Sequence, residues 1–109
     1  MFEIREGMKQ VNDVVVDTFE RDIMEGDTFM EAEAGTTGFC GGNREEGGRA
    51  YVRISALNAD FFARVTKDEK GRPDGLEIAV SGDDDIMALV KALWFAHRAL
   101  IEQINGEDE

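Results

Sequence analysis

Apolar residues in the first quarter of the chain recur every three or four positions, from Ile4 to Ile23. Polar and charged residues fill the positions between them, so this spacing predicts an amphipathic helix over about residues 4–25. Gly26 follows as a stop for that helix. The β-branched run 14–16 (Val-Val-Val) favours a strand instead. The length of the periodic segment decides for the helix.

Four shorter segments alternate apolar with polar residues, which is the period of a half-buried strand. They cover residues 28–34, 49–54, 61–66 and 76–80. The connection 67–75 contains the only proline and an Asp-Gly pair, which predict a hairpin turn between the last two segments. Short connections favour antiparallel pairing, because a parallel crossover needs about a dozen residues or more.

The clearest helical spacing runs from Ile86 to Ile104. Ser81 or Gly82 would cap this helix, and Asn105-Gly106 would end it. The three aspartates 83–85 lie where the helix dipole is positive. Consecutive carboxylates at a helix start point to different sides, so we interpret them as capping residues and not as a metal site.

These elements predict an α+β two-layer domain, in which an N-terminal and a C-terminal helix cover one face of a four-stranded antiparallel sheet. We expect residues 1–109 to form this single domain. Its parts are the N-terminal helix (1–26), the sheet with the C-terminal helix (28–106) and a tail (107–109).

The composition agrees with one globular domain, since 42% of the 109 residues are hydrophobic and 33% are charged. The net charge of −12 excludes non-specific binding to nucleic acid, which requires a basic surface. The sequence contains no apolar run long enough to span a membrane, and its first residues lead us to expect no signal peptide. The single cysteine, Cys40, fits a reducing compartment, so we expect a cytoplasmic protein.

Half of the twelve glycines lie in residues 35–48, together with two threonines and Arg44, and Arg49 follows directly. Glycine allows backbone amides to approach an anion closely, and hydroxyl and guanidinium groups add donors. The segment lacks the pattern of a Walker loop or of a dinucleotide fingerprint. The alternative is a hairpin loop whose glycines only supply turns. The predicted ligand-binding residues are Thr36, Thr37, Gly38, Gly41, Gly42, Arg44, Arg49 and Tyr51.

Residues suited to catalysis are few, because the chain has one histidine and one cysteine. His97 is expected at the edge of the core, hydrogen-bonded to the backbone. Cys40 has no histidine near it in the sequence, which disfavours a nucleophilic role. We therefore predict no enzyme, no catalytic residue, no metal site and no cofactor.

The glycine-rich segment and the strand after it carry a resemblance. The stretch 35–42 reads Gly-Thr-Thr-Gly-Phe-Cys-Gly-Gly, and 48–51 reads Gly-Arg-Ala-Tyr. Together with the Gly-Leu-Glu-Ile strand at 75–78 and the closing helix, it resembles small uncharacterised proteins of bacterial and phage genomes over about residues 29–104. The resemblance implies no activity, but a phage setting favours a role in counter-defence.

Two functions from different classes follow. The first is a non-enzymatic binding protein, of a phage counter-defence type, that sequesters an anionic nucleotide-derived ligand through its glycine-rich loop. The second is an acidic inhibitor of a nucleic-acid enzyme such as a defence-system protein, of the anti-CRISPR type, whose carboxylates replace phosphates. A third hypothesis is that the protein is an assembly subunit whose sheet edge pairs with a second copy.

The C-terminal helix has more large apolar residues than one face can bury. We therefore expect a homodimer or larger assembly with Trp94 or Phe95 at the contact. The competing explanation is that the N-terminal helix covers these two aromatic residues.

Overall fold

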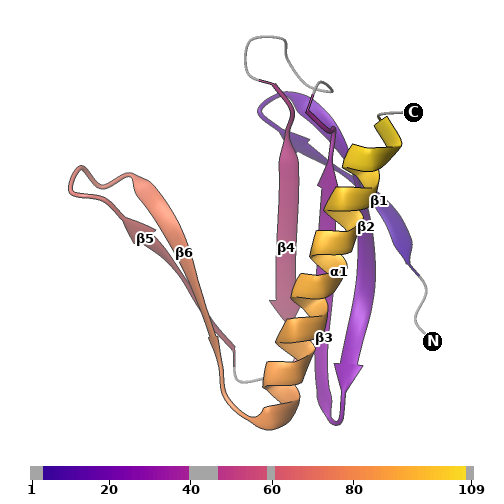
Figure 1. The fold of residues 1–109 in the computed structure, drawn as a ribbon. Helices are drawn as coiled ribbons and strands as arrows, with labels where there is room; N and C mark the ends of the chain where they lie inside the picture. Colours follow the sequence, from indigo (N-terminus) through magenta and orange to yellow (C-terminus); the bar gives the residue numbers. More distant parts are fainter. Residues whose placement is uncertain (1–3, 40–46, 59–60, 108–109) are drawn as a thin grey trace.

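The computed structural model describes residues 4–39, 47–58 and 61–107. These residues form six strands and one helix, which are β1 (Arg5–Val11), β2 (Val14–Glu25), β3 (Thr28–Thr36), β4 (Ala50–Ala56), β5 (Phe61–Lys67), β6 (Pro73–Val80) and α1 (Asp83–Glu107). Strands β1 to β4 form one antiparallel sheet in chain order, and β5 and β6 form a separate two-stranded sheet. Helix α1 packs on one face of the larger sheet, mainly over β3 and β2 (Figure 1).

The predicted N-terminal helix is wrong, because residues 5–25 form the β1–β2 hairpin. Asn12 and Asp13 both take positive φ angles, 49° and 68°, as the two loop residues of a type I′ hairpin turn do. The apolar residues Val15, Phe19 and Ile23 are four positions apart. Since four is an even number, this spacing also places them on one face of a strand, which explains why the pattern was ambiguous.

The predicted strands 28–34, 49–54, 61–66 and 76–80 are confirmed as parts of β3, β4, β5 and β6, and the C-terminal helix is also confirmed. Their arrangement in one four-stranded sheet covered by two helices is wrong. The hairpin β1–β2 completes the larger sheet, and β5–β6 leaves it. Helix α1 begins as expected, since the carbonyl of Gly82 accepts a hydrogen bond from the Ile86 amide (2.9 Å). Its last residue is Glu107 and not Asn105.

The core lies between α1 and β3 and consists largely of small side chains. Helix α1 contributes four buried alanines. Opposite them, β3 contributes two buried alanines and the fully buried Met30. Small side chains let a helix approach a sheet closely. The alanines concerned are Ala88, Ala92, Ala96 and Ala99 on α1 and Ala32 and Ala34 on β3.

The sheet face opposite α1 is largely polar, and the register also places the fully buried Val16 on it. The buried hydroxyl of Thr18 donates a hydrogen bond to the carboxylate of Glu33 (2.6 Å). Arg5 pairs with carboxylates of β2 and β3, and its hydrogen bonds, first to Asp22 and then to Glu20, raise the pKa of its guanidinium above the ordinary value. This face therefore stabilises the sheet through charged pairs and leaves α1 to cover the apolar face.

The β5–β6 hairpin projects from the body formed by β1–β4 and α1 as an arm (Figure 1). The whole chain measures 44 × 43 × 18 Å, and its radius of gyration is 15.3 Å. A compact chain of this length would have a radius of gyration of about 13 Å. The arm thus gives the molecule an open, flat shape. Within the described ranges, α1 is the one helix, and it falls short of the apolar length that crossing a bilayer requires.

Candidate functional site

The described part of the glycine-rich segment forms the base of a loop between β3 and β4. The Thr36 hydroxyl donates to the carbonyl of Arg49 (2.7 Å) and accepts from the Gly38 amide (3.0 Å). The Thr37 hydroxyl accepts from the Arg49 amide (2.9 Å). The buried guanidinium of Arg49 donates to the carbonyl of Gly47 (2.9 Å). These predicted anion donors therefore hold the two ends of the loop together.

Two positions in this base require glycine, one for its backbone angle and the other for a close backbone contact. Gly38 takes a φ of 80°, and a Cβ placed on Gly48 would lie 1.7 Å from the Gly38 carbonyl oxygen. No side chain fits at that distance, which accounts for part of the glycine pattern by packing alone. Gly41, Gly42, Arg44 and Cys40 lie outside the described residues.

Tyr51 lies on β4, two residues after Arg49, where it pairs with Gly35 on β3, and its side chain is on the polar face of the sheet. It is half-buried there, with the Lys9 ammonium 5.8 Å from its ring centroid. The ring contact of Tyr51 is therefore with Lys9 of β1. Anion binding by the loop stays a prediction.

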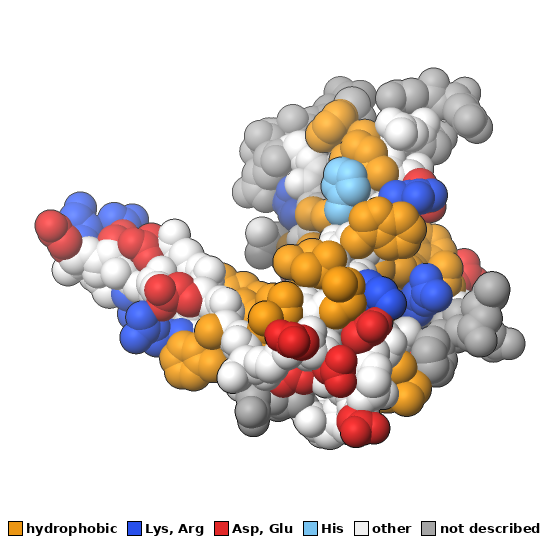
Figure 2. Space-filling view, turned by 60° about the horizontal axis from the view of Figure 1, so that its bottom comes forward, with side chains coloured by type: hydrophobic (Ala, Val, Ile, Leu, Met, Phe, Trp, Pro, Cys, Tyr) orange, Lys and Arg blue, Asp and Glu red, His pale blue; other side chains and the backbone are white. Residues whose placement is uncertain are grey.

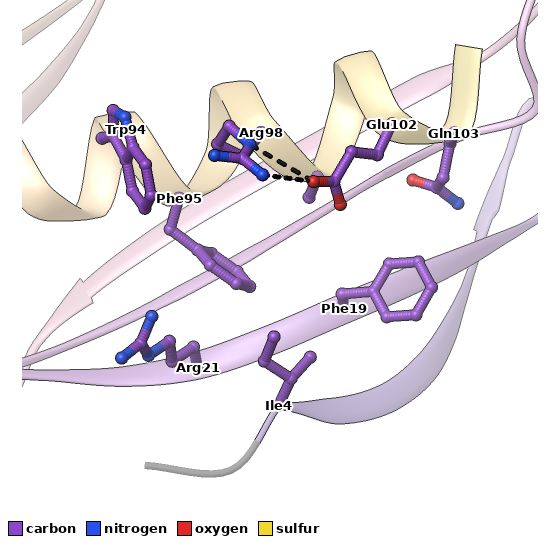
Figure 3. Close-up of a pocket in the computed structure, with 9 residues that line it drawn as sticks. Ile4, Phe19, Arg21, Trp94, Phe95, Arg98, Glu102 and Gln103 are labelled. Carbon is purple, nitrogen blue, oxygen red and sulfur yellow. Dashed lines mark hydrogen bonds and ion pairs between the residues drawn. The ribbon is translucent and has the colours of Figure 1, made fainter. Parts of the chain in front are cut away.

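A hollow of about 470 Å³ lies between α1 and β2, where the sequence predicted no site. Trp94 and Phe95 of α1 face Phe19 of β2 across it, and Ile4 closes one side (Figure 3). A second hollow of similar volume adjoins it and shares Arg21, Trp94 and Phe95 with it. We call the two together the α1–β2 groove. Each volume lies within the usual range for sites of small molecules.

Arg21 rises from β2 into this groove (Figure 3). Its Nε atom is buried and has no hydrogen-bond partner among the described residues. In contrast, Arg98 at the rim donates to Glu102 (2.7 Å), and its guanidinium lies 5.1 Å from the Trp94 ring centroid. A buried donor without a partner costs free energy, especially on a charged group. An anion that accepts a hydrogen bond from this Nε would remove that cost.

The end of α1 is tied to the sheet by Gln103. Its amide nitrogen donates to the carbonyl of Asp17 on β2 (3.0 Å), and its oxygen accepts from the Thr36 amide on β3 (3.1 Å). These two bonds fix the helix against the strands beside the groove. The groove walls are thus positioned by the fold before any ligand arrives.

The expected interface aromatics differ in their surroundings. Phe95 is 6% exposed and belongs to the core, whereas Trp94 is 55% exposed at the groove. The expected N-terminal helix does not cover them, because its residues form strands β1 and β2. His97 is exposed, so its expected place at the edge of the core is wrong. In the described ranges, no cluster of three or more His, Cys, Asp or Glu side chains has the arrangement of a metal site.

Sequence reasoning missed Arg21 and Phe19 as site residues because it placed residues 4–25 on a helix. On a strand, Phe19, Arg21 and Ile23 share one face, and an arginine between two apolar neighbours on a core-facing row is the signal that could have found the site. Comparisons of the chain with protein-family models, curated proteins and solved structures give no match. The resemblance over residues 29–104 accordingly stays a prediction.

Proposed function

We propose that this protein is a non-enzymatic binding protein that holds an organic anion in the α1–β2 groove. The observation that carries this proposal is the Arg21 guanidinium, which has a buried Nε without a hydrogen-bond partner among the described residues and lies between aromatic side chains. The phosphate or carboxylate of the ligand pairs with Arg21. Its aromatic or aliphatic body packs against Trp94 and Phe95.

The chemistry of the groove fits a nucleotide-derived ligand. A guanidinium offers two parallel donors to a phosphate, and an indole ring offers a flat apolar surface to a base. Among the described residues that line the first hollow, Glu102 is the one carboxylate, and it already pairs with Arg98. In the second hollow, Asp22 pairs with Arg5, and Lys91 pairs with Glu25. The described lining residues therefore supply recognition, and the carboxylates among them are already paired.

The single tryptophan of the chain provides the test, because Trp94 lines the groove. We would titrate nucleoside monophosphates, cyclic nucleotides and ADP-ribose while recording its fluorescence, and confirm binding by calorimetry. Arg21→Met should weaken binding of the best ligand by roughly 10- to 100-fold, since a charge-assisted hydrogen bond contributes about 1.5–3 kcal/mol. Arg53→Met, on the exposed side of β4, is the matched control and should leave the Kd unchanged.

Two outcomes would contradict this assignment. No fluorescence change and no heat with any of these anions at millimolar concentration would remove the proposed ligand class. The second is that Arg49→Ala loses binding while Arg21→Met binds normally. This result would place the ligand at the glycine-rich loop between β3 and β4.

An acidic inhibitor of a nucleic-acid enzyme is the second candidate. It is supported by carboxylates that gather where the β2–β3 turn meets the start of α1 (Figure 2). The Thr28 hydroxyl bonds to Asp85, and Gly26 lies against Asp84. Binding to such an enzyme should weaken steeply with salt and compete with its nucleic acid. Binding that is insensitive to salt would count against this candidate.

A further inference from the structure

The side of α1 that points away from the α1–β2 groove and towards the arm carries large apolar residues in a regular order. Ile86, Val90 and Leu93 are each about half exposed (50%, 52% and 50%). Together with three residues further along α1, they follow the alternating four–three spacing of a coiled-coil seam. We call this set the outer flank, and it consists of Ile86, Val90, Leu93, His97, Leu100 and Ile104.

The arm has one apolar face. The register pairs Phe61 with Val80, and the same face continues outward through the pairs Ala63–Ile78 and Val65–Leu76. Val65 and Leu76 near its tip are 53% and 63% exposed. The opposite face has Phe62 and Ala79 near the base of the arm and the Arg64–Glu77 ion pair further out.

The apolar face of the arm and the outer flank of α1 lie on the two sides of one open angle, which is the angle between the arm and the helix. Phe61 and Val80, at the base of the arm, pack against the core beside α1. The remaining pairs of that face therefore look to the same side as the core. In the space-filling view, hydrophobic side chains surround the single histidine on α1, to one side of the projecting arm (Figure 2).

We propose that a second copy of this chain occupies the angle, with the outer flanks of the two α1 helices packed together and each arm laid over the partner's helix. One chain supplies two surfaces that can cover each other, the uncovered apolar flank of α1 and the apolar face of the arm. A two-fold contact requires such self-complementary surfaces, because each copy presents the same patch to the other. The outer flank contains no Asp, Glu, Lys or Arg. The net charge of −12 per chain therefore does not place like charges along this seam.

The exposed area also fits a dimer. The chain exposes 7594 Å², whereas a compact protein of its mass exposes about 6,000 Å². The excess is sufficient for a standard interface, which buries about 800 Å² on each partner. In addition, an isolated two-stranded hairpin is marginally stable in water, so the arm gains stability from an apolar surface to lie on.

Light scattering after size exclusion at tens of micromolar tests the proposal. We expect twice the 12.1 kDa mass of one chain for the natural sequence. Leu93→Glu on the outer flank and Leu76→Glu on the arm should each give a folded monomer by circular dichroism. Val15→Glu is the control, because Val15 is equally exposed (58%) but lies at the far β1–β2 hairpin, and it should remain a dimer.

Cross-linking tests the arm separately. In chains carrying Cys40→Ser, a Val65→Cys chain and a differently tagged Val90→Cys chain are mixed and treated with a short bismaleimide. A covalent heterodimer is expected. A monomer at tens of micromolar, or a dimer that survives Leu93→Glu, would overturn the proposal. A dimer without the heterodimeric cross-link would overturn the contact between the arm and the partner's helix.

Discussion

Strand β3 and the β5–β6 arm are both antiparallel structure with an apolar face, but their surroundings differ. β3 has a strand on each side and α1 above it, and most of its residues are buried. In the part of the chain that the structure describes, the arm pairs only β5 with β6, and most of their residues are exposed. The apolar side chains of β3 therefore stabilise the chain itself, whereas those of the arm can contribute little until a partner covers them.

Hydrogen exchange should show the largest difference between these two regions. In the monomeric Leu93→Glu variant, the amides of β3 should exchange only through global unfolding, while those of β5 and β6 exchange through local opening. With a global stability of at least about 5 kcal/mol, the rates should differ by about a thousandfold or more. Mass spectrometry of peptic fragments measures this. Equal protection of both regions in a monomer would show that the arm is stable alone.

Removing one large apolar side chain from each region should have unequal costs. Met30→Ala deletes a fully buried side chain and should lower the free energy of unfolding by about 3 kcal/mol. Leu76→Ala on the arm should change it by less than about 0.5 kcal/mol at concentrations where the chain is monomeric. Urea denaturation followed by circular dichroism provides both values. A similar loss for the two variants would contradict the contrast.

Two threonine–carboxylate hydrogen bonds allow a finer comparison. Thr18 bonds to Glu33 in the buried part of the sheet (2.6 Å), and Thr66 bonds to Asp74 on the exposed arm (2.7 Å). Thr18→Val should cost about 2 kcal/mol because it removes the donor from a buried carboxylate. Thr66→Val should cost less than about 0.5 kcal/mol, since water replaces the hydroxyl. Denaturation of both variants tests this, and equal costs would contradict it.

The smallest effect is expected for the exposed ion pair between Arg64 and Glu77 on the arm. Both side chains are more than half exposed, and exposed pairs contribute about 0–1 kcal/mol. Glu77→Gln should therefore leave the unfolding midpoint nearly unchanged at both low and high salt. A loss of several degrees at low salt that disappears at high salt would assign this pair a structural role.

The sequence by itself determined the elements whose pattern admits one reading. The alternation in residues 28–34 and the aspartates before a long apolar repeat predicted β3 and α1, because these periods fit one secondary structure each. Residues 15, 19 and 23 have a spacing of four, which fits both a helix and a strand. The Asn-Asp turn and the valine run favoured the hairpin. How strongly such residues favour a strand depends on the neighbouring strand with which they pair.

Only the tertiary structure decided where the surfaces lie. Arg21 became a candidate ligand contact because β2 faces α1 there, and Thr36, Thr37 and Arg49 became the closure of a loop because β3 and β4 end side by side. The apolar residues of α1 were visible in the sequence, but which of them pack inward depends on the alanines that meet β3. Burial depends on contacts between residues that are far apart in the chain. The local spacing of apolar residues does not show which of these distant residues will meet.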